Sequence, residues 1–234
     1  MHKYILTHKD MEPVNGFEII DNRKSDLDHR LWSEIAGMKI LYDRIKKQED
    51  DAGNGNKVEY IPEWINLNHY RRMFDKDCYN RVYVAQPIIL PCSVAQHYSS
   101  MHFIEDLQLM GKAIKECYPN MVQVSEQVLN GNIFIPYNIG IMPVKQFMDW
   151  MTFILTVLKK VDEYLGQPNF DKMKEIISKR EQPKVDGRNN NIAYQSRIYS
   201  FEAERLSTIY WLACAKQISV FPAKINLLEE GQKI

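Results

Sequence analysis

The sequence predicts an α/β fold, with helices flanking a central, mostly parallel sheet. Short runs rich in β-forming residues alternate with helical patterns of ten or more residues, the order typical of parallel strands with helical connections. Hydrophobic residues make up 45% of the 234 residues, enough for a substantial core. Residues 82–90 are apolar almost throughout, as is typical of a central strand. We therefore expect a single domain spanning residues 1–234.

The first half of the chain predicts four strands and one long helix. Apolar residues recur at helical spacing over residues 28–47, whereas residues 50–57 are polar and rich in turn formers. The four expected strands are the short β-rich runs at residues 3–7, 17–20, 64–68 and 82–90.

The second half predicts mainly helices. Residues 132–142 form a strand-like run in which Pro136 favours a bend or an edge. Pro143 then suits the first turn of a helix, and Gly166 suits its C-terminal cap. Residues 181–191 are polar and rich in turn formers, so we expect a mobile loop there. This loop would be either a flexible lid or a segment on the acceptor side of the site. The remaining expected helices span residues 103–117, 171–179 and 201–216.

Composition excludes several classes of protein. Lys and Arg together number 30, as do Asp and Glu, so a general basic surface for nucleic acid is not expected. No run is long and apolar enough for a transmembrane segment, and the first residues do not resemble a signal peptide. The four cysteines are scattered without a CxxC pair, which favours reduced thiols. These features predict a cytoplasmic protein.

Two adjacent arginines mark a candidate anion site. His69, Tyr70, Arg71 and Arg72 follow directly after the strand expected at residues 64–68, and ligands of parallel sheets bind at the carboxyl ends of strands. Guanidinium groups offer a rigid, always-charged set of donors that suits a phosphate or diphosphate. The alternative is that the arginines form ordinary surface ion pairs with neighbouring acids, namely Glu63, Asp75 and Asp77.

A metal site has only weak support. Asp75 and Asp77 form a DxD pattern of the kind that holds a divalent cation against a diphosphate, and residues 26–28 form another. Two such patterns are close to what chance gives for a chain with this many aspartates. We therefore expect no firm cofactor, with Mn²⁺ or Mg²⁺ at Asp75 and Asp77 as the alternative.

Several motifs together resemble a glycosyltransferase-like family of capsular-polysaccharide and lipopolysaccharide biosynthesis in bacteria and viruses. This family was formerly a domain of unknown function of the DUF4422 type, and its hallmark is a strand that runs into His-Tyr-Arg-Arg-Tyr-Phe. Here that segment is HYRRMF, residues 69–74. The other matching motifs are Thr7-His8-Lys9, Ser33-Glu34-Ile35-Ala36, Tyr98 with His102 and Asp106, YNIGIM at 137–142, and RIYSFEAERL at 197–206. Met73, Ala36 and Gly140 depart from the family pattern.

The resemblance implies a GT-A-like nucleotide-binding sandwich that transfers a sugar from a nucleoside diphosphate sugar. Arg71 and Arg72, helped by His69, would then neutralise the donor diphosphate. Further donor-binding candidates are Thr7, His8, Glu34, Asn138, Arg197 and Arg205, with Tyr70, Tyr98 and His102 as additional site candidates. The alternatives stay open: Thr7 and His8 suit simple strand-end capping, and Asn138 with Gly140 suits a β-bulge.

The same resemblance points to Glu204 as the catalytic base, with His69 as a second catalytic candidate. Glu202 and Glu204 are two residues apart on a helix, so at most one should face the site. Glu204 matches the family motif, and a carboxylate can deprotonate an acceptor hydroxyl. A structural ion pair between Glu204 and Arg205 is the alternative.

The expected partners are a nucleotide-sugar donor and a growing surface-polysaccharide acceptor. A lipid-linked acceptor would place the protein peripherally at the inner membrane face. The rival class is a catalytically degenerate nucleotide- or carbohydrate-binding scaffold in polysaccharide biosynthesis.

Overall fold

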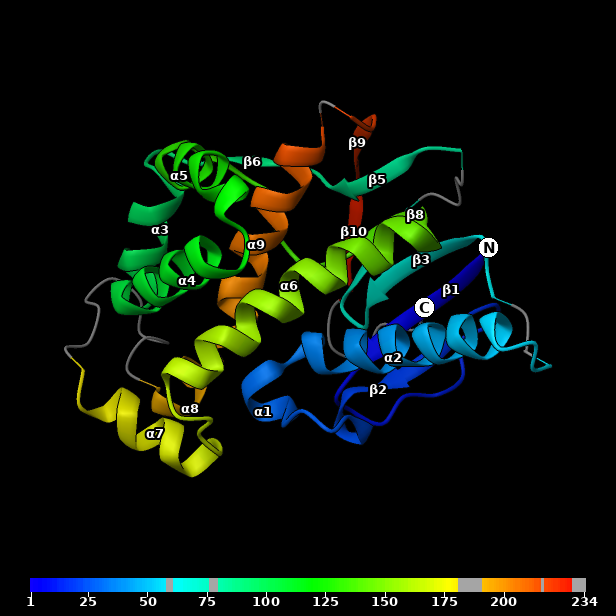
Figure 1. Ribbon diagram of the computed structural model, residues 1–234, viewed down its shortest axis with the longest axis horizontal. Coiled ribbons are helices and arrows are strands. Elements are labelled where there is room, and N and C mark those ends of the chain that lie inside the picture. Colours follow the sequence, from blue (N-terminus) through cyan, green and yellow to red (C-terminus); the bar gives the residue numbers. More distant parts are fainter. Residues whose placement is uncertain (58–60, 76–79, 181–190, 216, 229–234) are drawn as a thin grey trace.

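The computed structural model describes residues 1–57, 61–75, 80–180, 191–215 and 217–228 (Figure 1). An eight-stranded sheet forms its centre. The strands are β1 (His2–Thr7), β2 (Glu18–Asp21), β3 (Trp64–His69), β4 (Arg72–Phe74), β5 (Val82–Ala85), β8 (Gly140–Pro143), β9 (Val220–Ala223) and β10 (Ile225–Leu227). A separate two-stranded sheet joins β6 (Ile88–Ile89) to β7 (Ile133–Phe134).

The directions of the strands confirm a mostly parallel sheet. β1 is parallel to both β2 and β3, and β5 is parallel to β9. β8 is inserted antiparallel between β3 and β5, and β4 runs antiparallel to β3 and β10. Strands β1, β2, β3, β5, β9 and β10 therefore share one direction, against β4 and β8.

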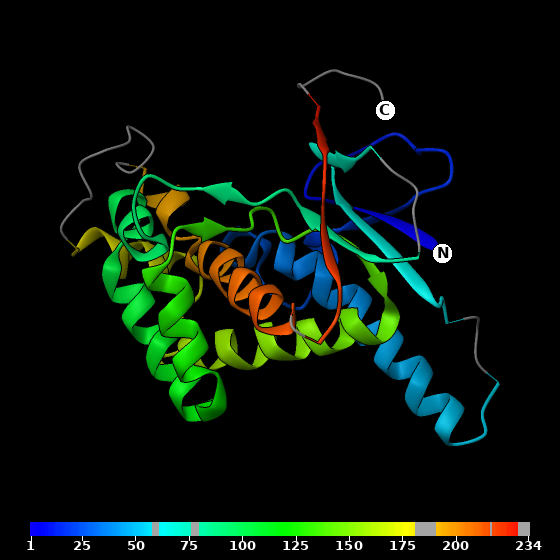
Figure 2. The same cartoon turned by 90° about the horizontal axis from the view of Figure 1, so that it is seen from above.

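The helices pack on this sheet and on one another (Figures 1 and 2). Figure 2 shows α2 and α6 lying along the same face of the sheet, with α9 beside α6. The helices are α1 (His29–Trp32), α2 (Glu34–Gly53), α3 (Val94–Met101), α4 (Ile104–Cys117), α5 (Val122–Asn130), α6 (Val144–Tyr164), α7 (Phe170–Ser178), α8 (Ile192–Gln195) and α9 (Ile198–Cys214). Among the described residues, no helix is long and apolar enough to cross a membrane.

Aromatic residues of α6 and α9 form the centre of the core. Phe147 and Trp150 of α6 are fully buried, and Trp150 packs against Trp211 of α9 with ring centroids 5.1 Å apart. Large buried rings contribute strongly to stability, since each removes a large apolar area from water. This packing fixes α9 across the interior, with most of its residues buried.

Two of the expected strands are interrupted. Residues 82–90 divide into β5 and β6, which belong to different sheets, and Ile88 and Ile89 are exposed. Residues 132–142 likewise divide into β7 and β8. Between them, Tyr137 and Asn138 adopt positive φ angles of 77° and 37°, which turn the chain sharply.

The helix expected at residues 28–47 is also two helices. Ser33 separates α1 from α2 because its backbone adopts φ 51° and ψ −125°, outside the helical region. α2 continues to Gly53, so the first residues of the expected loop at 50–57 are helical. The loop expected at 181–191 lies outside the described residues except for Asn191, whose side chain caps α8.

Candidate functional site

The carboxyl ends of β1 and β3 bring the first candidate residues together. These neighbouring parallel strands are in register at Leu6 and His69, so Thr7 and His8 lie at the same sheet edge as His69 and Tyr70. A tight turn at Tyr70 and Arg71 then leads into β4, with His69 paired to Arg72. This is the edge at which open α/β sheets bind ligands.

The antiparallel strand β8 adds Asn138 to this edge. Gly140 at the start of β8 pairs with Leu67 near the end of β3, so the preceding turn reaches the same place. Asn138 is buried, and its amide nitrogen donates to Oε1 of Glu34 at 2.9 Å. The turn therefore connects the sheet edge with the first residue of α2.

Glu34 is held by groups from the turn before β8 and from the start of α9. Besides Asn138, the hydroxyl of Ser200 on α9 lies 3.0 Å from both carboxylate oxygens. The Arg197 guanidinium lies 4.0 Å from the same carboxylate and donates to the Ser33 hydroxyl at 2.6 Å. Burial opposes ionisation of Glu34, but the positive charge of Arg197 and the hydrogen bond from the Asn138 amide outweigh it and lower its pKa.

A second carboxylate, Glu204 of α9, faces the same turn. Its Oε1 accepts from the Tyr137 backbone N–H at 3.1 Å, and its Oε2 accepts from the Arg205 guanidinium at 3.1 Å. The side chain remains 22% exposed. Burial raises the pKa of Glu204, Arg205 counteracts part of this, and the negative charge of Glu34 adds to it. A carboxylate whose pKa is raised is a stronger base than an ordinary one, which suits it to accept a proton.

Arg205 supports Glu204 from the core. Its guanidinium lies over the rings of Tyr98 and Phe134, 4.9 and 4.7 Å from their centroids. It also donates to the Phe201 carbonyl at 3.1 Å and contacts Nδ1 of His97 at 3.3 Å. Only 2% of the side chain is exposed. Its observed contacts thus make Arg205 a positioning group for Glu204.

Arg72 is the best placed cation for a ligand. Its guanidinium lies 4.2 Å from the centroid of the Tyr137 ring, next to the turn that binds both carboxylates. Its Nε is buried and has no hydrogen-bond partner among the described residues. Within the described parts of the chain, neither Arg71 nor Arg72 forms an ion pair, so the surface-pair alternative has no support there.

His69 is buried and neutral. Burial is the main cause that lowers its pKa to about 3; Glu34 opposes the shift, and the charges of Arg72 and Arg71 reinforce it. Its Nδ1 accepts from the Arg71 backbone N–H at 3.4 Å. A neutral ring that accepts at Nδ1 carries its proton on Nε2. His69 is thus prepared to donate a hydrogen bond to a ligand.

Tyr70 forms a half-buried aromatic surface beside His69. The His8 ring meets it edge-on at 5.3 Å, and the cations of Arg71 and Lys9 lie 5.2 and 5.7 Å from its centroid. The Thr7 hydroxyl both donates to and accepts from the Lys9 backbone at 3.0 Å. Thr7 thus caps the end of β1, in agreement with the alternative interpretation of this residue as a strand-end cap.

Tyr98 and His102 belong to a neighbouring buried cluster. The Tyr98 hydroxyl donates to Asp106 at 3.4 Å, Arg180 pairs with the same aspartate, and His102 contacts Gln195 at 3.0 Å. Glu202 is also buried there, and burial raises its pKa well above the usual range. This cluster touches the site through the Arg205 guanidinium over Tyr98, and through Phe201, which stacks on His102 and lies under the Arg197 guanidinium. Glu202 and Glu204 therefore face different surroundings, as their spacing predicted.

The structure gives no support to a metal centre in its described part. There, no group of three or more His, Cys, Asp or Glu side chains is arranged to hold an ion. Asp26 binds Lys39, and Asp28 caps α1 and pairs with Arg30, so this DxD pattern is structural. Asp75 is exposed, and Asp77 lies outside the described residues.

Sequence reasoning missed two serines that shape the site. Ser200 binds Glu34, and Ser207 donates to Oδ1 of Asn138 at 2.6 Å while accepting from the Trp150 indole at 3.2 Å. A signal was available: Arg197, Ser200, Glu204 and Ser207 recur at intervals of three and four in a mostly apolar helix. Such spacing places them on one face.

Comparison with known proteins supports a glycosyltransferase-like fold. The pattern of a family described as a domain of unknown function (DUF4422) matches residues 78–178, less than half of the chain. The solved apo structure of WbbM, a bifunctional glycosyltransferase, superimposes with a TM-score of 0.64 at 12% identity, over 97% of this chain and 45% of that one. This chain thus spans less than half the length of WbbM. No curated protein matches the sequence.

Proposed function

We propose that this protein is a glycosyltransferase that moves a sugar from a nucleoside diphosphate sugar to a saccharide acceptor. The observation that carries the proposal is the convergence of Glu34, Glu204 and Arg72 on the Tyr137–Asn138 turn at the carboxyl edge of the sheet. Carboxylates and cations placed this close are suited to acid–base chemistry on an anionic substrate. The fold shared with WbbM supports this reading.

The donor would lie across the ends of β1 and β3. Arg71 and Arg72 face its diphosphate, and Nε2 of His69 donates to a phosphate oxygen. The half-buried ring of Tyr70 and the exposed His8 imidazole offer an aromatic surface for the nucleoside. Arginines can stabilise the negative charge that develops on the leaving diphosphate. In other transferases a divalent metal ion stabilises this charge. Mn²⁺ or Mg²⁺ at Asp75 and Asp77 remains the alternative.

Glu204 would act as the base. Its carboxylate takes the proton of the acceptor hydroxyl while that oxygen bonds to the sugar carbon and the bond to the diphosphate breaks. Glu34, kept ionised by Arg197, would bind donor hydroxyl groups beside Asn138. Raised and lowered pKa values in two neighbouring carboxyls are a common way of dividing such roles.

The acceptor would be a growing surface polysaccharide such as capsule, exopolysaccharide or O-antigen. Incubation with a panel of nucleoside diphosphate sugars and short saccharides tests the proposal, with free nucleoside diphosphate as the product measured. Release with one or more donors is expected. Nucleotide binding without any release would favour the degenerate binding protein instead, and the absence of both would reject the donor site.

A further inference from the structure

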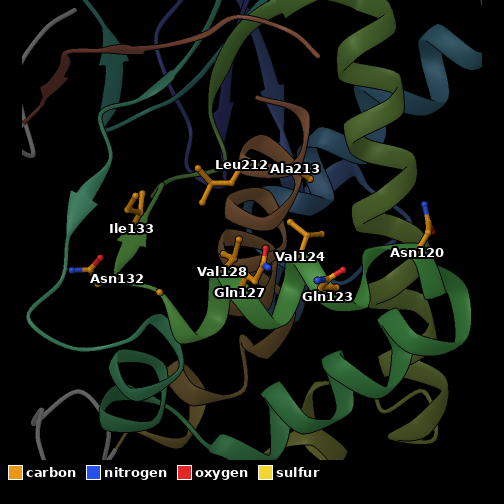
Figure 3. A pocket seen from close by; sticks show the side chains of 10 residues that line it. Asn120, Gln123, Val124, Gln127, Val128, Asn132, Ile133, Leu212 and Ala213 are labelled. Carbon is orange, nitrogen blue, oxygen red and sulfur yellow. The ribbon is translucent and has the colours of Figure 1, made fainter. Parts of the chain in front are cut away.

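A hollow of about 580 Å³ lies outside the candidate site, between α5, the end of α9 and the segment that enters β7 (Figure 3). Its size falls in the range of about 300–1,000 Å³ that is typical of small-molecule sites. It is lined by Asn120, Gln123, Val124, Gln127, Val128, Gly131, Asn132, Ile133, Leu212 and Ala213. None of the residues that bind Glu34 or Glu204 belongs to this lining.

The helix α5 presents two different rows of side chains to this hollow. Gln123 and Gln127 are one helical turn apart, and so are Val124 and Val128. The glutamines add carboxamide donors and acceptors beside an apolar strip, and Asn132 adds a further amide near the start of β7. Of the described residues that line the hollow, none carries a charge.

This chemistry fits a neutral ligand with many hydroxyl groups. Carboxamides can both donate hydrogen bonds to hydroxyl groups and accept hydrogen bonds from them. Valine, leucine and isoleucine side chains can pack against the C–H groups of such a ligand. A nucleotide or an acidic polymer would find no cation here to offset the cost of losing its hydration. We propose that the hollow binds neutral sugar units of an oligosaccharide, away from its reacting end; this rests on the proposed transferase function.

The location suits an acceptor subsite. Ile133 of β7 is four residues from Tyr137, whose backbone binds Glu204. Along α9, Leu212 follows Glu204 by eight residues, about 12 Å at the rise of an α-helix. An acceptor several sugars long is large enough to bind in the hollow and to reach Glu204 at the same time. A monosaccharide can occupy only one of these two places.

The test uses the full chain without nucleotide. Short linear neutral glucans, galactans, mannans and rhamnans are titrated while the side-chain amide signals of Gln123 and Gln127 are followed by NMR, with a heparin fragment as the charged comparison. Neutral oligosaccharides should shift these signals. The double variant Gln123→Ala with Gln127→Ala should bind about tenfold more weakly, as expected for two lost hydrogen bonds.

Glu126→Ala is the matched control, because Glu126 is an exposed residue of the same helix that does not line the hollow. Unchanged affinity in the double variant, an equal loss in the control, equal binding of the heparin fragment, or no shift with any neutral oligosaccharide would overturn the inference. The outcome is separable from the transferase proposal: oligosaccharide binding here without nucleoside diphosphate release would retain the hollow as a saccharide site and reject the enzyme.

Discussion

Arg72 has an environment unlike that of a surface arginine. It stacks on Tyr137 and keeps a buried Nε without a partner among the described residues. If it binds the donor diphosphate, Arg72→Ala should weaken nucleoside diphosphate binding by about 1.5–3 kcal/mol, the usual value for a charge-assisted hydrogen bond. Calorimetry with nucleoside diphosphates measures this directly.

Arg44→Ala is the control for this substitution, since Arg44 forms an exposed ion pair with Glu18 far along α2. Exposed pairs contribute about 0–1 kcal/mol, so this variant should bind nucleotide normally. If Arg72→Ala binds normally while its melting temperature falls, Arg72 is structural.

The role of Arg205 can be tested through the pH dependence of activity. Glu204 must be ionised to accept a proton, and the Arg205 charge opposes the rise in its pKa that burial causes. Arg205→Met should therefore raise the Glu204 pKa further and move the acid limb of the activity profile to higher pH. Arg205→Lys keeps a charge and should shift it less. An unmoved acid limb in folded Arg205→Met protein would contradict this assignment.

At this scale the sequence and the family resemblance selected most of the residues that meet at the site. His69, Arg72, Glu34, Asn138, Arg197 and Glu204 all lie around one turn or its immediate neighbours. Ser200 and Ser207 were missed because serine is common and carries no charge, so only its position on the helix distinguishes it. The separation of Tyr98 and His102 into another cluster depends on tertiary packing, which short motifs do not encode.

At the scale of elements, two of the helices were predicted closely, whereas α3, α5 and α8 were not expected. The expected helix at 103–117 and the helix opening at Pro143 agree with α4 and α6 to within a residue or two, since apolar periodicity marks each buried face. The runs at 82–90 and 132–142 each predict one strand, but each is divided between two sheets. One part of each run belongs to the main sheet and the other part forms the small β6–β7 pair. Pairing between segments so far apart in the sequence depends on tertiary contacts.

The break between α1 and α2 stores strain at the site. Ser33 holds φ 51°, a conformation that costs a residue with a Cβ atom about 1–3 kcal/mol. Ser33→Gly and Ser33→Ala both remove the hydroxyl that accepts from Arg197, and they differ only in the Cβ atom. Ser33→Gly should therefore be more stable than Ser33→Ala by about 1 kcal/mol or more. Chemical denaturation measures the difference; equal stabilities would show that the break is unstrained.

For the whole molecule, the arrangement of layers explains why the site forms where it does. The parallel strands β1 and β3 end together, antiparallel β8 returns a turn to the same edge, and α9 crosses the interior to supply Glu204 and its supporting groups. Residues far apart in the sequence thus depend on one another for position. The fold is shared with a glycosyltransferase at 12% identity.

The most direct test compares wild-type protein with Glu204→Gln in the nucleoside diphosphate release assay, with donor binding measured in parallel by calorimetry. Glutamine keeps the size of the side chain and can still accept from the Tyr137 N–H, but it cannot take a proton. We predict that Glu204→Gln binds donor about as well as wild type and releases nucleoside diphosphate at least about a hundredfold more slowly, the usual contribution of a general base. Equal release by both proteins would contradict the assignment of Glu204 and with it the proposed site.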